Sequence, residues 1–258
     1  MALASGRRLG DTRAMARARK KRRGRWQSPW RRLRRWLLFG LAGILAFSVL
    51  LVAPLRWVDP LTTSFMLQHN WQALWSEERR PARQASVPWE GISPHAALAV
   101  IAAEDQRFPL HRGFDFRSMS DAIAEYRRGG RMRGASTISQ QTAKNLYLWP
   151  RQSLFRKAVE AYFTVLLEAL LPKRRILEIY LNHAQFGADI YGVEAASRTY
   201  FGKPAADLTP SEAALLASVL PNPVRFRVDA PSDHVRGRQA WIQRQMQQLG
   251  GTRYLERL

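Results

Sequence analysis

The chain has 258 residues, no cysteine and a formal net charge of +21. This length suits one sizeable domain with appendages, and the absence of cysteine excludes disulfides, a catalytic thiol and a Cys-ligated zinc ion. The charge implies an anionic partner and is uneven, because residues 1–35 hold fourteen Lys or Arg and one acid, Asp11, which leaves a net +8 for the other residues.

Residues 36–55 form an uninterrupted run of twenty uncharged residues. As a helix, this run would span a bilayer core of about 30 Å. A buried core helix and a cleaved signal peptide are the alternatives, but the basic segment in front is too long for a signal peptide and no A-x-A site follows. We therefore predict a single-pass anchor in the inner membrane, with residues 1–35 as a cytoplasmic tail and residues 56–258 in the periplasm.

The Arg-rich tail is also compatible with nucleic-acid binding. Beside a membrane span, topology and contact with anionic lipids explain the tail better, and no groove-binding motif accompanies it. We expect membrane lipids, and no nucleic acid, among the partners.

Beyond the anchor, we predict a linker or membrane-proximal segment over residues 56–84 and the main domain over residues 85–258. Alternating strand patterns are scarce there, so the predicted fold class is mainly α. Several residues have the position and chemistry of helix N-caps: Ser93 before Pro94, Ser153, and the capping box of Thr209 with Glu212.

One stretch, residues 112–134, resists a helical assignment, and its second half is rich in Arg and Gly. We predict a mobile basic loop in that second half. Beside a site such a loop would clamp an anionic ligand or gate entry, and a solvated surface loop explains the sequence equally well.

Glu104 is the first candidate for chemistry. At helical spacing it shares a face with Ala97, Ile101 and Phe108, and desolvation there raises a carboxyl pKa toward general acid/base use. A purely structural acid is the alternative, but a helix C-terminus disfavours an anion. For Asp105 we predict a bond to His111 or to a backbone N–H, and for both a structural role.

The second candidate is the segment 134–145. On a helix, Ser136, Gln140 and Lys144 form one polar stripe, with Gln141 and Asn145 beside it. These groups supply many hydrogen-bond donors in fixed directions, which suits a sugar or phosphate ligand. A capping box of Thr137 with Gln140 is the alternative, and it explains only those two residues.

The third candidate is a helix predicted over residues 154–171, preceded by Arg151 and apolar nearly all round. Its polar exceptions form one narrow stripe: Arg156, Lys157, Glu160, Thr164 and Glu168. The stripe must face a cavity, a partner or its own members. For Glu160, a simple i, i+4 ion pair with Arg156 is as good an explanation as a functional role.

Taken together, these residues allow two chemistries. Two carboxylates, Glu104 and Glu160, suit glycoside hydrolysis. Several cations suit a pyrophosphate leaving group instead, because it departs without protonation once its charge is neutralised: Lys144, Arg151, Arg156 and Lys157.

Five stretches, in order, resemble the motifs of the membrane-bound peptidoglycan glycosyltransferases, the family of the polymerase domain of bifunctional penicillin-binding proteins and of monofunctional biosynthetic transglycosylases. They are Glu104-Asp105-x-x-Phe108-x-x-His111-x-Gly113, Gly134-x-Ser136-Thr137-Ile138-x-Gln140-Gln141-x-x-Lys144-Asn145, Arg156-Lys157-x-x-Glu160, Ile176-Leu177-Glu178-x-Tyr180-Leu181-Asn182, and the region from Tyr191 to Pro223. Five ordered motifs over residues 85–225 carry a low false-positive risk.

The resemblance implies a lysozyme-like helical fold with a smaller membrane-facing lobe, and polymerisation of lipid II with release of undecaprenyl pyrophosphate. It makes Glu104 the general base on the acceptor hydroxyl and assigns Lys144 and Arg151 to the donor pyrophosphate, with Glu160 grouped among the catalytic residues. Phe108 would shape the pocket, and the turn would be braced by Asp105, His111 and Gly113. The substrate subsites would be lined by Ser136, Thr137, Gln140, Gln141, Asn145, Arg156 and Lys157.

The resemblance also leaves room for a divalent cation, Mg²⁺ or Mn²⁺, at the pyrophosphate, with ligands that the sequence does not locate. Lipid II and the nascent glycan strand are the expected partners, and cell-division or elongation proteins are candidates. Too few residues follow the fifth motif for a transpeptidase domain, so we expect a monofunctional enzyme. A lysozyme-like hydrolase and a non-enzymatic anchored scaffold or nucleic-acid binder are the rival hypotheses.

Overall fold

The computed structural model describes residues 29–129, 136–151 and 153–258. The chain divides into two compact units, residues 1–50 and 51–258. The described part of the first unit belongs to helix α2 (Pro29–Val52), whose apolar side chains are mostly exposed. Within the described residues, one helical stretch, Trp30–Arg56, is long and apolar enough to cross a membrane. This agrees with the predicted anchor, although the helix begins earlier than residue 36.

The second unit is built from helices, as predicted. Their bounds are α3 Ser64–Leu74, α4 Pro94–Glu104, α5 Phe116–Arg127, α6 Ile138–Tyr147, α7 Leu154–Leu170, α8 Lys173–His183, α9 Val193–Phe201, α10 Pro210–Val219 and α11 Asp233–Gln248, with short 3₁₀ helices at Ala53–Arg56, Trp89–Gly91, Phe108–Leu110, Ala205–Asp207 and Gly251–Arg257. Two two-residue strands, β1 (Arg83–Gln84) and β2 (Ile190–Tyr191), pair in parallel, with Arg83 opposite Ile190.

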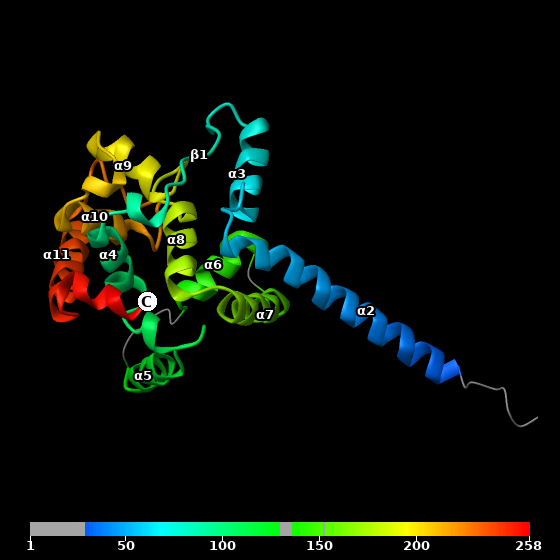
Figure 1. Cartoon of the computed structure of the whole chain (residues 1–258). Coiled ribbons are helices and arrows are strands. Elements are labelled where there is room, and N and C mark those ends of the chain that lie inside the picture. The colour runs from blue at the N-terminus through cyan, green and yellow to red at the C-terminus, as the bar shows by residue number, and fades with distance from the viewer. Residues whose placement is uncertain (1–28, 130–135, 152) are drawn as a thin grey trace, which may run out of the picture. The chain divides into compact units, whose positions relative to one another are not determined.

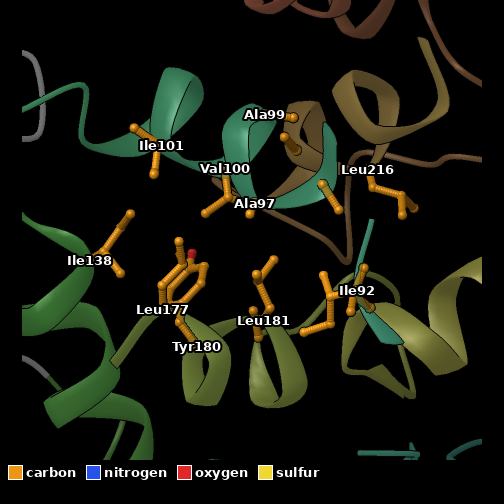
Figure 2. Packing of buried hydrophobic residues seen from close by; sticks show 14 of the residues in the cluster. Ile92, Ala97, Ala99, Val100, Ile101, Ile138, Leu177, Tyr180, Leu181 and Leu216 are labelled. Carbon is orange, nitrogen blue, oxygen red and sulfur yellow. The ribbon is translucent and has the colours of Figure 1, made fainter. Parts of the chain in front are cut away.

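Helix α4 lies at the centre of this unit. It packs against α10 and α11 (Figure 1), and every residue from Ala96 to Ala102 is buried. Figure 2 shows its Ala97, Val100 and Ile101 facing Leu177 and Leu181 of α8, with Ile138 of α6 and Leu216 of α10 closing the same core. Because four of the seven buried side chains from Ala96 to Ala102 are alanine methyl groups, the neighbouring helices can approach α4 closely.

The predicted N-caps are confirmed. Ser93 Oγ accepts a hydrogen bond from His95 N at 3.3 Å, and Ser153 Oγ accepts one from Arg156 N at 3.1 Å. Thr209 and Glu212 form a reciprocal capping box at the start of α10. Such caps satisfy the free N–H groups of a helix N-terminus.

Two predictions about irregular segments need correction. Residues 116–127, predicted to resist helix formation, form α5, because Asp115 caps the helix by accepting a hydrogen bond from Ser118 N at 3.0 Å. The predicted basic loop falls mostly on residues 130–135, outside the described residues. The segment 56–84 is also more than a linker, because it contains α3, which begins with Thr63 as its N-cap.

Candidate active site

Glu104 is the last residue of α4, and its side chain is 13% exposed. Its Oε2 accepts a hydrogen bond from Gln141 Nε2 at 2.9 Å, and its Oε1 lies 3.1 Å from Arg238 Nη2. Burial raises the pKa of the Glu104 carboxyl, and the Gln141 and Arg238 hydrogen bonds act in the opposite direction. The direction is the one expected from its apolar flank, and it suits a group that must accept a proton.

The turn after Glu104 has the predicted structural bonds. His111 Nε2 lies 3.0 Å from both carboxylate oxygens of Asp105, and Asp105 Oδ2 also accepts a hydrogen bond from Ile138 N at 3.0 Å. Asp105 therefore joins the end of α4 to the start of α6. Gly113 leaves the turn at φ +85°, where a side chain is disfavoured.

The second motif forms the N-terminus of α6. Thr137 and Gln140 make a capping box, and Thr137 Oγ1 also donates to Gly113 O at 2.6 Å. Both side chains are buried and hold the backbone, so the capping role is established for them. Ser136 precedes the N-cap and lies outside the helix, which corrects its predicted helical position, but Ser136, Gln140 and Lys144 still line one pocket.

A cationic pocket of about 260 Å³ lies between α6 and α7. It contains the Lys144 ammonium, whose pKa is lowered by burial while Glu160 opposes the shift. Glu160 Oε2 lies 3.0 Å from Arg156 Nη1, and its other oxygen bonds Lys157. Three cations and one carboxylate thus share a small cavity, which leaves an excess of positive charge for an anionic ligand.

Helix α7 buries polar residues of its stripe and exposes apolar residues at its N-terminus. Arg156 and Glu160 are only 8% and 3% exposed, whereas Leu154 and Phe155 are 92% and 71% exposed. The part of the stripe formed by Arg156, Lys157 and Glu160 lines the pocket, so the ion-paired residues are also pocket-lining residues. Farther along the stripe, Glu168 has a structural role. It accepts a hydrogen bond from Ser139 and forms an ion pair with Lys173 at 2.7 Å.

A larger cavity of about 770 Å³ adjoins the cationic pocket. Ser136 and Gln141 line both of these cavities, and Glu104 lines the larger of the two. Gln141 is thus the bridge between carboxylate and cations, and its amide oxygen accepts a hydrogen bond from Tyr180 Oη at 3.0 Å. The combined groove has room for sugar rings on the Glu104 side and a charged group on the Lys144 side.

Three predicted site residues lie elsewhere. Phe108 is fully buried, because its 3₁₀ helix turns the ring into the core under Lys173, so it does not line the groove as predicted. Arg151 is exposed and Asn145 half-buried, and within the described chain neither borders the cationic pocket, although Pro150 does. The structure therefore does not bring Arg151 to Lys144.

Sequence reasoning missed residues from two segments that it had set aside. The C-terminal helix α11 supplies Arg238 and Trp241 to the larger cavity. In the segment 56–84, Phe65 of α3 lines the cationic pocket, with its ring 5.6 Å from Lys144 Nζ. No spacing in the sequence connects these residues with Glu104 or Lys144, because the contacts exist only after folding.

The described residues do not fit a resident divalent cation. Within them, no group of three His, Asp or Glu side chains is placed to hold a metal ion. Glu160, the carboxylate of the cationic pocket, is already bound by Arg156 and Lys157. A resident metal ion therefore has no set of three such ligands among the described residues, and a Mg²⁺ or Mn²⁺ held through the substrate's pyrophosphate stays a prediction.

The chain has a mainly helical fold and a groove that joins a buried carboxylate to a cationic pocket, and this arrangement is compatible with a glycosyltransferase. The model of the transglycosylase family matches residues 72–247. The chain belongs to this family.

Curated relatives cover nearly the whole chain. A biosynthetic peptidoglycan transglycosylase of Chromohalobacter salexigens is 49% identical over 228 residues, which are 88% of this chain and 97% of that protein. Proteins of the same name from Xylella fastidiosa and Pseudomonas putida are 48% and 46% identical, over 88% of this chain and 93% and 95% of their own lengths.

Proposed function

We propose that this protein polymerises lipid II into peptidoglycan glycan strands and releases undecaprenyl pyrophosphate. One observation carries the proposal: Gln141 and Ser136 connect the cavity of Glu104 with the pocket of Lys144. A proton acceptor and a phosphate-binding site therefore adjoin each other, as transfer from a lipid-linked pyrophosphate requires. The names of the relatives support the same activity.

In the proposed reaction, the acceptor's sugar hydroxyl gives its proton to the Glu104 carboxylate as its oxygen attacks the anomeric carbon of the donor. The bond from that carbon to the pyrophosphate oxygen breaks, and the leaving group keeps the electron pair. Lys144, Arg156 and Lys157 neutralise its charge, so it departs without protonation. Arg151 reaches the pyrophosphate only by movement of its exposed side chain.

Hydrolysis by two carboxylates is the less favoured alternative. That mechanism needs a second carboxyl group free to act as nucleophile or base. Glu160 is held between Arg156 and Lys157, so a structural role within the cationic pocket suits it better than a reacting one.

We also propose that the chain is anchored in the inner membrane with its second unit in the periplasm. The apolar helix α2 and the fourteen basic residues within residues 1–35 support this orientation. It would tether the second unit to the membrane in which lipid-linked substrates lie.

The test is a lipid II polymerisation assay on the full chain in detergent, comparing wild type with Glu104→Gln. Loss of a positioned general base lowers turnover by about 10²–10⁴-fold. Glu256→Gln is the matched control, because Glu256 is exposed on the C-terminal 3₁₀ helix. Shortening of preformed glycan without lipid II, or full polymerisation by Glu104→Gln, would reject the proposal.

A further inference from the structure

The position of Glu104 is electrostatically unfavourable. It ends α4, and the unpaired carbonyl groups of a helix C-terminus repel a carboxylate. Burial among apolar side chains adds a desolvation penalty for the ionised form. A cation beside the carboxylate in this place would favour its ionised form.

Arg238 is that cation, brought by α11 from 134 positions along the chain. One nitrogen, Nη2, lies 3.1 Å from Glu104 Oε1 and 3.4 Å from Ala103 O. The same guanidinium therefore contacts the carboxylate and a terminal carbonyl of α4. Its Nε is buried and finds no hydrogen-bond partner among the described residues, so the contacts of Nη2 are the hydrogen bonds that hold this guanidinium there.

The other carboxylate oxygen is held from the opposite side. Gln141 Nε2 donates to Glu104 Oε2 at 2.9 Å, and Tyr180 Oη donates to Gln141 Oε1 at 3.0 Å, which fixes the direction of the amide. Burial keeps the pKa of Tyr180 well above its usual value, so its hydroxyl stays a donor. Each oxygen of Glu104 thus has one donor and keeps a free lone pair to receive a proton.

We propose that Arg238 is a positioning residue that keeps the Glu104 carboxylate ionised and directed into the groove. The proposal rests on the proposed function, in which Glu104 is the general base. Arg238 acts through Glu104, and its effect should therefore appear in the pH dependence of turnover.

Several other charged groups surround Glu104. Lys144 on α6 favours its ionised form, while Tyr180 on α8 contacts the same amide. The cavities that Glu104 lines are also bordered by Asp105, Arg107, Asp115, Asp121, Glu125, Asp233 and His234. Among the cations of the described chain, Arg238 donates a hydrogen bond directly to Glu104, so its removal should have the largest effect on ionisation.

The sign of the effect follows from these contacts. An adjacent cation lowers a carboxyl pKa, so Arg238→Gln should raise that of Glu104. A general base must be deprotonated, and the acid limb of the kcat profile should therefore move to higher pH, by about one unit. At a pH below the limb, this shift corresponds to about a tenfold loss of kcat.

The experiment measures kcat and KM for lipid II polymerisation by the full chain between pH 5 and 9. Arg238→Gln is compared with Arg238→Lys, which keeps the charge, and with Arg236→Gln, which removes an equal charge from an exposed position of α11. We expect a shifted acid limb and an unchanged KM in Arg238→Gln, partial recovery in Arg238→Lys and the wild-type profile in Arg236→Gln. Thermal unfolding of each variant verifies that it is folded.

The outcomes separate this proposal from the proposed function. If Glu104→Gln is inactive but Arg238→Gln keeps the wild-type acid limb, the role of Arg238 is overturned and that of Glu104 stands. A raised KM with an unmoved limb would make Arg238 a substrate-binding residue and would also overturn the proposal. If Arg238→Gln does not fold, the limb of Arg238→Lys decides, since loss of the guanidinium contact with Glu104 and Ala103 O should still move it upward.

Discussion

Substitution of Gly113 by alanine adds one methyl group and should measurably destabilise the fold. Its φ is +85°, and a Cβ there would lie 2.8 Å from Thr164 Cγ2 and 3.2 Å from Glu168 Cγ. The left-handed backbone and the forced contact each cost an alanine about 1–2 kcal/mol. We therefore expect Gly113→Ala to lower the free energy of unfolding by about 2–4 kcal/mol.

Urea unfolding of the full chain at constant detergent concentration, followed by tryptophan fluorescence, measures this loss. Gly202→Ala is the matched control. Gly202 also has a positive φ, +69°, but a Cβ there would meet nothing within 4 Å. It should lose only the backbone part, about 1–2 kcal/mol.

A second substitution isolates the contact itself. Thr164→Ser removes Cγ2 and keeps the Oγ1 hydrogen bond to Glu160 O, which measures 2.7 Å. In the Gly113→Ala background it should restore about 1 kcal/mol or more relative to its effect alone. Equal losses in Gly113→Ala and Gly202→Ala, with no coupling to Thr164, would refute the packing argument.

Two further predictions concern the site and its support. Lys144→Met should reduce lipid II turnover by about 10²-fold or more. It should not lower the free energy of unfolding, because burial already disfavours the charged form of Lys144. Near-normal turnover would contradict a role for Lys144 at the pyrophosphate, and Arg151→Ala tests the more exposed cation in the same assay. Asp105→Ala should cost about 1–3 kcal/mol in urea unfolding, because it leaves the Ile138 N–H without its acceptor. Asp105→Asn retains an acceptor oxygen and should lose less, and an unchanged midpoint in Asp105→Ala would contradict the assignment.

The helix caps could be predicted because each depends on residues only three or four positions apart in the sequence. Thr137 with Gln140 and Thr209 with Glu212 are reciprocal pairs at fixed spacing. The bond between Asp105 and His111 also spans only six positions. Asp115 with Ser118 belongs to the same class of signal, but the Arg- and Gly-rich residues that follow obscured it.

The rest of the site depends on packing between distant segments. Arg238 meets Glu104 across 134 positions, and nothing in the spacing of α11 distinguishes it from the exposed Arg236. Phe108 is the opposite case. It belongs to a motif, but its side chain is buried in the core and does not line the groove. Sequence pattern identifies which residue types are present, whereas the fold decides which of them reach the groove.

The complete burial of α4 has a consequence for how this enzyme loses activity. A reactive group on a surface loop can be displaced while the rest of the molecule stays intact. Glu104 instead ends a helix whose residues from Ala96 to Ala102 have almost no access to solvent, so local fraying cannot release it without opening the core. Loss of activity on heating and global unfolding should therefore occur at the same temperature. Replacing the alanine at position 97, 99 or 102 with a larger residue should both displace the reactive carboxylate and destabilise the fold.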